Sequence, residues 1–156
     1  MPTLQEAVDD FLAQKRIAVF GVSRDSAQAA NLVYRNLRKA NYEVFAINPN
    51  ATEVEGDRCY ADLSSIPGGV AAAVVATTPE VTDSVVRECA EHGVSRVWMH
   101  RSFGKGSVSG EAAAFCREQG VSVIAGACPN MFLPGTDVGH RCMRFVLKLT
   151  GGLPKP

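Results

Sequence analysis

The stretch IAVFGVSRDS, residues 17–26, decides the fold. Four apolar residues lead into Gly21, a short polar loop follows, and a helical pattern of apolar residues begins soon afterwards. A buried strand that ends at a glycine and leads into a helix is typical of a nucleotide-binding α/β unit. Because this loop contains a single glycine, the kind of nucleotide has to be inferred from the residues that follow the other strands.

Outward from this stretch, short β-branched runs alternate with longer stretches of helical period, which predicts a layered α/β fold. The expected strands are continuously apolar, as strands covered on both faces tend to be, and they span residues 16–21, 42–48, 70–77, 95–100 and 121–126. The crossovers are long enough to make neighbouring strands parallel. Between residues 49 and 69 we expect a loop, a short strand near Cys59 and one helical turn. We predict a Rossmann-like, doubly wound parallel sheet of five strands, in the order 3-2-1-4-5, with helices on both faces.

A chain of 156 residues can bury one sizeable core, so we expect a single domain. It would consist of an N-terminal helix at 3–14, a core at 15–130 and a C-terminal helix at about 136–150. Thr3 and Glu6 have the spacing of a capping box at the start of the first helix. The last helix is predicted to end at Gly151 and to bury a stripe formed by Val138, Cys142, Phe145, Val146 and Leu149.

Composition limits the classes of binding partner that we expect and indicates the cellular compartment. The 16 basic and 16 acidic residues cancel, so no long-range field attracts nucleic acid or an anionic membrane, and we expect neither as a partner. The five cysteines are an odd number without a CxxC pair, which argues against a disulfide framework. Without a signal-peptide pattern or a run long enough to span a bilayer, the predicted location is the cytoplasm.

The predicted ligand site lies where the parallel strands end, at the carboxyl edge of the sheet. Gly21 permits a tight turn, Ser23 offers a hydroxyl group, Arg24 adds a cation, and the next helix begins with free backbone N–H groups. Together they favour a phosphate. Asn48 and Pro49 follow the second strand, and a helix start that includes Thr77 and Pro79 follows the third.

A dinucleotide site of the usual kind needs G-x-G-x-x-G and an acidic residue after the second strand. Ser23 and Ser26 stand where the later glycines would be, and the second strand ends in Asn48. An NAD(P)-dependent oxidoreductase is therefore kept only as an alternative.

The chain resembles stand-alone CoA-binding proteins, which are similar to the N-terminal domain of the succinyl-CoA synthetase alpha subunit. The resemblance covers roughly residues 15–130 and rests on VFGVSR, NYEVFAINP, EGDRCYADLSSIP, TTPE, GVSRVWMH and a cysteine after the last strand. It implies binding of coenzyme A, free or acylated, in a carrier, sensor or regulatory role without catalysis. The residues that it implies for the coenzyme are Gly21, Val22, Ser23 and Arg24 at the diphosphate, Asn48 and Pro49 at the adenosine or pantetheine arm, Thr77 and Pro79 in the same crevice, and Met99, His100 and Arg101 after the fourth strand.

Cysteine and histidine residues at the same sheet edge make an enzyme the main alternative to a non-catalytic CoA-binding protein. Cys128 follows the fifth strand and His100 the fourth, and His140 would join them if the last helix folds back. Zinc is disfavoured because the spacing matches no compact metal motif. The alternatives are acyl-CoA or thiol transfer by Cys128 and His100, a mixed disulfide between Cys128 and CoA, and an interaction domain with a vestigial crevice. Assembly with a second copy or with an enzyme also stays open.

Overall fold

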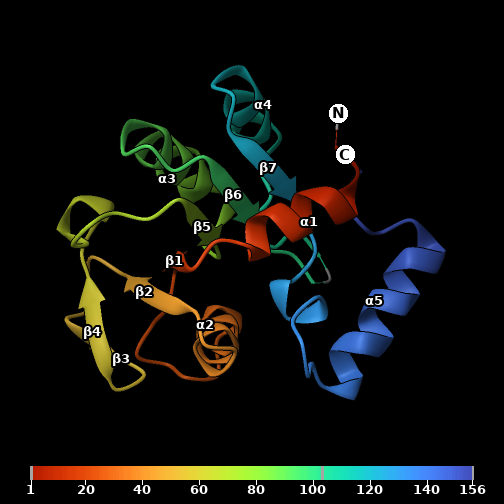
Figure 1. The fold of residues 1–156 in the computed structure, drawn as a ribbon, viewed down its shortest axis with the longest axis horizontal. Coiled ribbons are helices and arrows are strands. Elements are labelled where there is room, and N and C mark those ends of the chain that lie inside the picture. The colour runs from red at the N-terminus through yellow and green to blue at the C-terminus, as the bar shows by residue number, and fades with distance from the viewer. Residues whose placement is uncertain (1, 103, 156) are drawn as a thin grey trace.

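The computed structural model describes residues 2–102 and 104–155. Its strands form one sheet in the order β3-β4-β2-β1-β5-β6-β7 (Figure 1). All neighbouring strands are parallel except β3 and β4, which form an antiparallel hairpin at the edge of the sheet. The strands are β1 (Arg16–Phe20), β2 (Glu43–Ile47), β3 (Glu53–Val54), β4 (Asp57–Tyr60), β5 (Ala72–Val75), β6 (Arg96–Met99) and β7 (Ser122–Ala125).

The α/β class and the parallel core are confirmed, but the predicted strand order is wrong. The strand predicted at 70–77 does not pair with β2; it is β5, which pairs with β1 and sets Val74 beside Val19. The free edge of β2 is taken by the short strand at Cys59, β4. It reaches that edge because the chain reverses at Glu55 and Gly56, which have φ angles of +53° and +78°. Within the described residues, the sheet therefore has seven strands. The predicted order 3-2-1 fits its first half only if β4, and not the strand at 70–77, is counted as the third strand.

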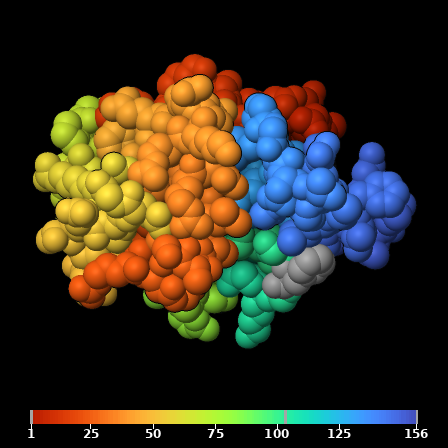
Figure 2. All heavy atoms as spheres, turned by 90° about the horizontal axis from the view of Figure 1, so that it is seen from below, coloured from red at the N-terminus to blue at the C-terminus, as the bar shows by residue number. Residues whose placement is uncertain are grey.

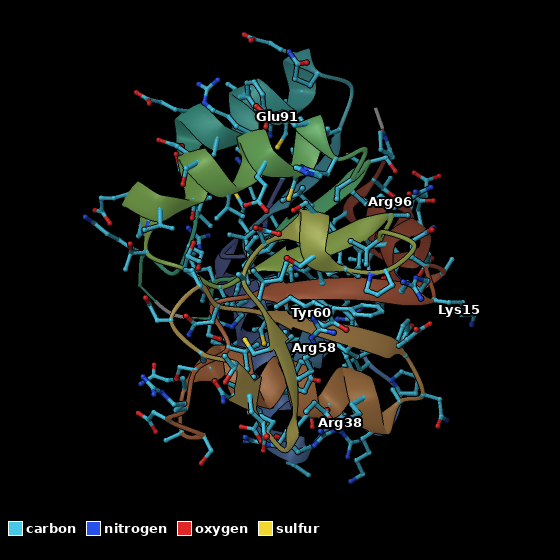
Figure 3. All side chains as sticks on the ribbon, turned by 90° about the vertical axis from the view of Figure 1, so that its left-hand side faces the viewer. Lys15, Arg38, Arg58, Tyr60, Glu91 and Arg96 are labelled. Atoms are coloured by element: carbon cyan, nitrogen blue, oxygen red, sulfur yellow. The ribbon has the colours of Figure 1, made fainter. Side chains whose placement is uncertain are left out.

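Helices cover both faces of the sheet, as expected. One face packs against α1 (Leu4–Leu12), α2 (Ala29–Lys39) and α5 (Val138–Thr150), and the other against α3 (Pro79–Glu91) and α4 (Gly110–Glu118). Figure 3 shows α3 and α4 on one side of the sheet and α2 on the other. Two short 3-10 helices, η1 (Leu63–Ser65) and η2 (Pro129–Met131), lie in the connections. None of the helices in the described ranges has the length and apolar character that crossing a bilayer requires.

The start of α1 follows directly from its sequence. The Thr3 hydroxyl accepts a hydrogen bond from the Glu6 N–H (3.2 Å), and the Glu6 carboxylate accepts one from the Thr3 N–H (2.7 Å). The predicted capping box is thus present, and it satisfies two backbone donors that the first turn of a helix leaves unpaired.

The orientation of α5 contradicts its predicted buried stripe. Val138, Phe145 and Leu149 are 65%, 63% and 71% exposed, and the rest of that stripe also faces solvent. Within α5, all of whose residues the structure describes, Leu147 alone is buried. Its neighbour on the inward face, Met143, packs partly against the core. The apolar stripe is real, but η2 and the following loop hold the helix so that a different face meets the body of the protein.

Candidate functional site

The ends of β1, β2 and β5 meet at Gly21. This residue has a φ of +97°, and a Cβ atom placed on it would lie 2.3 Å from the carbonyl oxygen of Ala76, which follows β5. The Gly21 N–H also donates to the carbonyl of Ile47 at the end of β2 (3.1 Å). No other residue type fits a backbone that approaches its neighbour so closely with a positive φ. The glycine therefore allows the ends of the three strands to lie close together.

A buried asparagine at the start of α2 holds the loop after Gly21. The Asn31 side chain is fully buried and accepts a hydrogen bond from the Ser23 N–H (3.0 Å). Its amide nitrogen donates to the Ser23 carbonyl (2.7 Å) and to the Glu55 carboxylate (2.7 Å). Asn31 was not among the predicted site residues. The available signal was an amide in the first turn of a helix whose neighbouring positions are apolar.

Some of the remaining polar groups of this loop are hydrogen-bonded within the protein, and others are not. The Ser23 hydroxyl accepts from the Asp25 N–H (3.1 Å), and the Asp25 carboxylate accepts from the Ala27 N–H (3.0 Å). Hydrogen bonds from Gln28 and Ala27 lower the pKa of Asp25, which keeps this carboxyl group charged. The N–H groups of Ser26, Ala29 and Ala30 have no acceptor within residues 2–102 and 104–155. Free donors at the start of a helix are a general site for anions.

The side-chain amide of Asn48 ties the loop after β1 to the loop after β2. Its nitrogen donates to the carbonyl of Val22 (3.0 Å), and its oxygen accepts from the Asn50 N–H (2.9 Å). Val22 itself is fully buried, so it contributes backbone rather than a side chain. A cavity of about 320 Å³ adjoins this point and is lined by Arg24, Pro49, Asn50, Ala51, Thr52 and Glu53. In the part of the chain that the structure describes, Arg24 forms no ion pair.

Thr77 lies beside the same strand ends, because its backbone nitrogen is 3.5 Å from the Cβ position of Gly21. Its hydroxyl lies 3.1 Å from that of Thr82, which is buried and donates to the Ser107 carbonyl (2.8 Å). Pro79 is the first residue of α3, two positions further on. The start of α3 is thereby fixed to the segment that follows β6.

The three residues predicted at the end of β6 do not join this group. Met99 is fully buried in the core between the sheet and α3 and α4. The Arg101 N–H donates to the Ala127 carbonyl (2.9 Å), and its guanidinium lies 3.4 Å from the Gly152 carbonyl. Arg101 therefore turns toward the end of β7. His100 is buried and belongs to a separate cluster.

That cluster contains His100, Ser102 and Cys128. The Ser102 hydroxyl lies 3.5 Å from His100 Nε2. Burial, with a smaller contribution from His140, lowers the pKa of His100 to about 4. Burial raises the pKa of Cys128 to about 11. At neutral pH the imidazole is uncharged and the thiol protonated, so this cysteine is not an activated nucleophile.

His140 is near this cluster but is engaged elsewhere. Its Nδ1 lies 2.6 Å from the Asp137 carboxylate, at the start of α5. Hydrogen bonds from the His140 backbone and ring lower the pKa of Asp137. Within residues 2–102 and 104–155, no three histidine, cysteine or acidic side chains are grouped as a metal site requires.

A parallel sheet whose first strand ends in a glycine turn, beside free helix N–H groups, defines a Rossmann-like nucleotide-binding protein. Comparison with known families is more specific. Residues 15–134 match the model of the CoA binding domain, and the chain belongs to this family.

Relatives include both large ligases and small proteins. The chain is 27% identical over 123 residues to "Acetate--CoA ligase [ADP-forming] I" of Archaeoglobus fulgidus, matching 75% of this chain and 18% of the ligase. It therefore spans about a fifth of the length of that relative. It is 28% identical over 127 residues to the uncharacterized protein YneT of Bacillus subtilis, covering 81% of this chain and 91% of YneT. A conserved hypothetical protein from Pyrococcus furiosus is 30% identical, with a TM-score of 0.62 over 72% of this chain and 92% of that one.

Proposed function

We propose that the chain binds coenzyme A in the crevice formed by the ends of β1, β2 and β5. The observation that carries this proposal is the free set of N–H groups at Ser26, Ala29 and Ala30, held in place by the Asn31 bridge. They suit the diphosphate because a helix N-terminus and its dipole favour negative charge. Membership of the CoA binding domain family supports the choice of coenzyme A over other phosphorylated ligands.

The other residues of the crevice fit the remainder of the coenzyme. Arg24 is free to pair with a phosphate, and the cavity of about 320 Å³ beside it has room for part of the nucleotide. Gly21 leaves the backbone bare where the diphosphate would pass, because no side chain fits there. Thr77 and Pro79 would border the pantetheine arm. Asn48 would act by positioning the loop, since its amide already contacts Val22 and Asn50.

The proposed role is that of a carrier, sensor or regulatory module, free of catalysis. Thiol transfer by Cys128 and His100 would need a thiolate, and burial raises the pKa of this thiol to about 11. An NAD(P)-dependent oxidoreductase would need a carboxylate after β2 for the ribose hydroxyls, and the residue there is Asn48. Neither alternative is favoured by the geometry around it.

Calorimetric titration tests the ligand. We expect heat of binding with CoA and with acetyl-CoA. In a parallel thermal-shift measurement, both should raise the melting temperature, and NAD, NADP or ATP should have a weaker effect or none. A larger stabilisation by NAD than by CoA would overturn the proposal.

Turnover tests the absence of catalysis. Acetyl-CoA incubated with the protein should release its thiol at the uncatalysed rate, measured with a chromogenic disulfide reagent. A faster release that disappears in Cys128→Ala would replace the carrier role with an enzymatic one. Mass spectrometry after treatment with CoA disulfide is expected to show no CoA adduct on Cys128.

A further inference from the structure

The outward face of α5 is apolar along its whole length. With 3.6 residues per turn, Val138, Cys142, Phe145, Val146 and Leu149 fall on one side of the helix, nearly opposite the inward residues Met143 and Leu147. Val138, Phe145, Val146 and Leu149 are all among the exposed large hydrophobic residues of the protein. Figure 2 shows α5 in dark blue, projecting at one end of the molecule. Large contiguous exposed apolar patches are a common feature of interaction surfaces.

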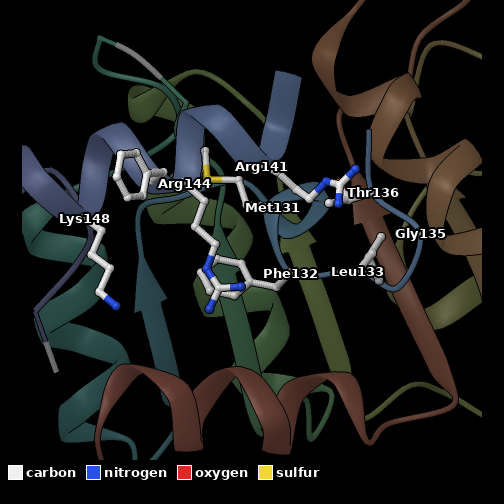
Figure 4. Close-up of a pocket in the computed structure, with 9 residues that line it drawn as sticks. Met131, Phe132, Leu133, Gly135, Thr136, Arg141, Arg144 and Lys148 are labelled. Atoms are coloured by element: carbon white, nitrogen blue, oxygen red, sulfur yellow. The ribbon is translucent and has the colours of Figure 1, made fainter. Parts of the chain in front are cut away.

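One flank of this face bears a row of cations. Arg141, Arg144 and Lys148 are three or four residues apart, and they line a cavity of about 590 Å³ together with Phe145, Phe132 and Thr136 (Figure 4). Arg144 lies over the Phe132 ring at 4.4 Å and donates to the Gln5 side chain. Within the described ranges, none of the three cations is paired with a carboxylate. The opposite flank holds Gly139 and Thr150 and has no charge.

We propose that α5 docks an amphipathic helix of a partner protein, with an apolar face and a row of acidic residues along one edge. The apolar face would pack on Val138, Phe145 and Leu149, and the acidic row would pair with Arg141, Arg144 and Lys148. The one-sided arrangement of charge on α5 fixes the orientation of such a partner, because only one flank of the apolar face attracts carboxylates. This inference does not depend on the binding of coenzyme A.

The same charges disfavour a second copy of this chain. Two α5 helices packed antiparallel about a two-fold axis would set Arg141, Arg144 and Lys148 against the same residues of the other copy. Packed in parallel, each cation row would face Gly139 and Thr150 and remain unpaired. Neither arrangement neutralises the cations, whereas an acidic helix neutralises all three.

The test uses two designed peptides of about four helical turns, labelled with fluorescein. Both have leucine along one face, and one edge holds glutamate in the first peptide and lysine in the second. Fluorescence anisotropy should show the wild-type protein binding the glutamate peptide at least about tenfold more tightly than the lysine peptide. Arg141→Glu/Lys148→Glu should reverse this preference, and Val138→Ser/Leu149→Ser should weaken binding of the glutamate peptide about tenfold.

Val81→Ser is the matched control, because Val81 is an exposed apolar residue (45%) on the distant helix α3. It should leave binding unchanged. The replaced side chains are exposed, so each variant should unfold at the wild-type temperature. As a second readout, the glutamate peptide should slow alkylation of Cys142, the exposed cysteine at the centre of the face.

Three results would overturn the proposal. The first is equal binding of both peptides, which would show that the cations do not select the partner. The second is a dimer in sedimentation experiments that Val138→Ser/Leu149→Ser abolishes, which would assign the face to a second copy. The third is association with phosphatidylcholine–phosphatidylglycerol vesicles that the same variant abolishes, which would assign it to a lipid surface.

Discussion

Replacing Asn31 by alanine should weaken both the fold and the proposed coenzyme site. Asn31 is fully buried and makes three hydrogen bonds, two to the backbone of Ser23 and one to the Glu55 carboxylate. Alanine removes all three and leaves the Ser23 groups without their buried partner. The loop that positions the free N–H groups at the start of α2 then loses its main tie to the helix.

The size of the effect follows from these bonds. Each of the two bonds to Ser23 is worth about 1 kcal/mol and the bond to the Glu55 carboxylate about 2 kcal/mol. Alanine recovers about 0.6 kcal/mol through its higher helix propensity. We therefore expect the free energy of unfolding to fall by about 3 kcal/mol. In the folded variant, a less ordered loop should weaken CoA binding by at least about tenfold, or about 1.4 kcal/mol.

Urea denaturation followed by tryptophan fluorescence measures the first quantity. Trp98 is the single tryptophan and is fully buried, so its emission reports unfolding of the core. Calorimetric titration with CoA, well below the melting temperature, measures the second. Asn36→Ala is the matched control, since Asn36 lies on the same helix and its side chain makes no hydrogen bond within the described ranges.

Two results would refute this reasoning. If Asn31→Ala and Asn36→Ala unfolded within about 0.5 kcal/mol of each other, the three hydrogen bonds would contribute nothing net to stability. If Asn31→Ala bound CoA with wild-type affinity, the loop after Gly21 would not hold the coenzyme.

Three further substitutions distinguish effects on folding stability from effects on CoA binding. Gly21→Ala should lower the free energy of unfolding by about 3 kcal/mol, measured by urea denaturation, because its Cβ would collide with the Ala76 carbonyl. Ser23→Glu should leave the melting temperature within a few degrees and abolish CoA binding in calorimetry, since it adds negative charge beside the diphosphate; normal binding would move the site elsewhere. His100 has a folded pKa of about 4, below its ordinary 6.5, so stability should fall as pH drops from about 6.5 to 4. In urea melts His100→Gln should flatten this loss, and an unchanged slope would contradict it.

The sequence sufficed for features that depend on local pattern. The strands β1, β2, β5, β6 and β7 and the capping box at Thr3 and Glu6 were predictable because burial on both faces and helix capping leave direct marks in a sequence. The residues of the apolar stripe of α5 were also predicted correctly. Its burial was not, because helical periodicity identifies which side chains share a face and cannot say whether that face meets the core or solvent. The exposed Phe145 and Leu149 show the difference.

Around the proposed site, the sequence predicted which strand ends come together and did not predict the residue that holds the loop between them. The parallel topology brings Gly21, Asn48 and Thr77 to one edge, and the structure places them together. Met99 is the last residue of β6 and was expected at this edge, but its side chain points into the core. Asn31 was missed because its role depends on contacts with Ser23 and Glu55, which no spacing along the chain reveals.

One element accounts for both the wrong strand order and the missed asparagine. The β3–β4 hairpin contains a strand of only two residues, Glu53–Val54, too short for a periodic pattern. By turning at Glu55 it delivers β4 to the edge of β2 and displaces the strand at 70–77 from that position. The same turn sets the Glu55 carboxylate against Asn31 and Arg35, each within 2.8 Å. The hairpin thus completes the sheet and braces the loop after Gly21, so an error in its placement affects both the predicted topology and the proposed site.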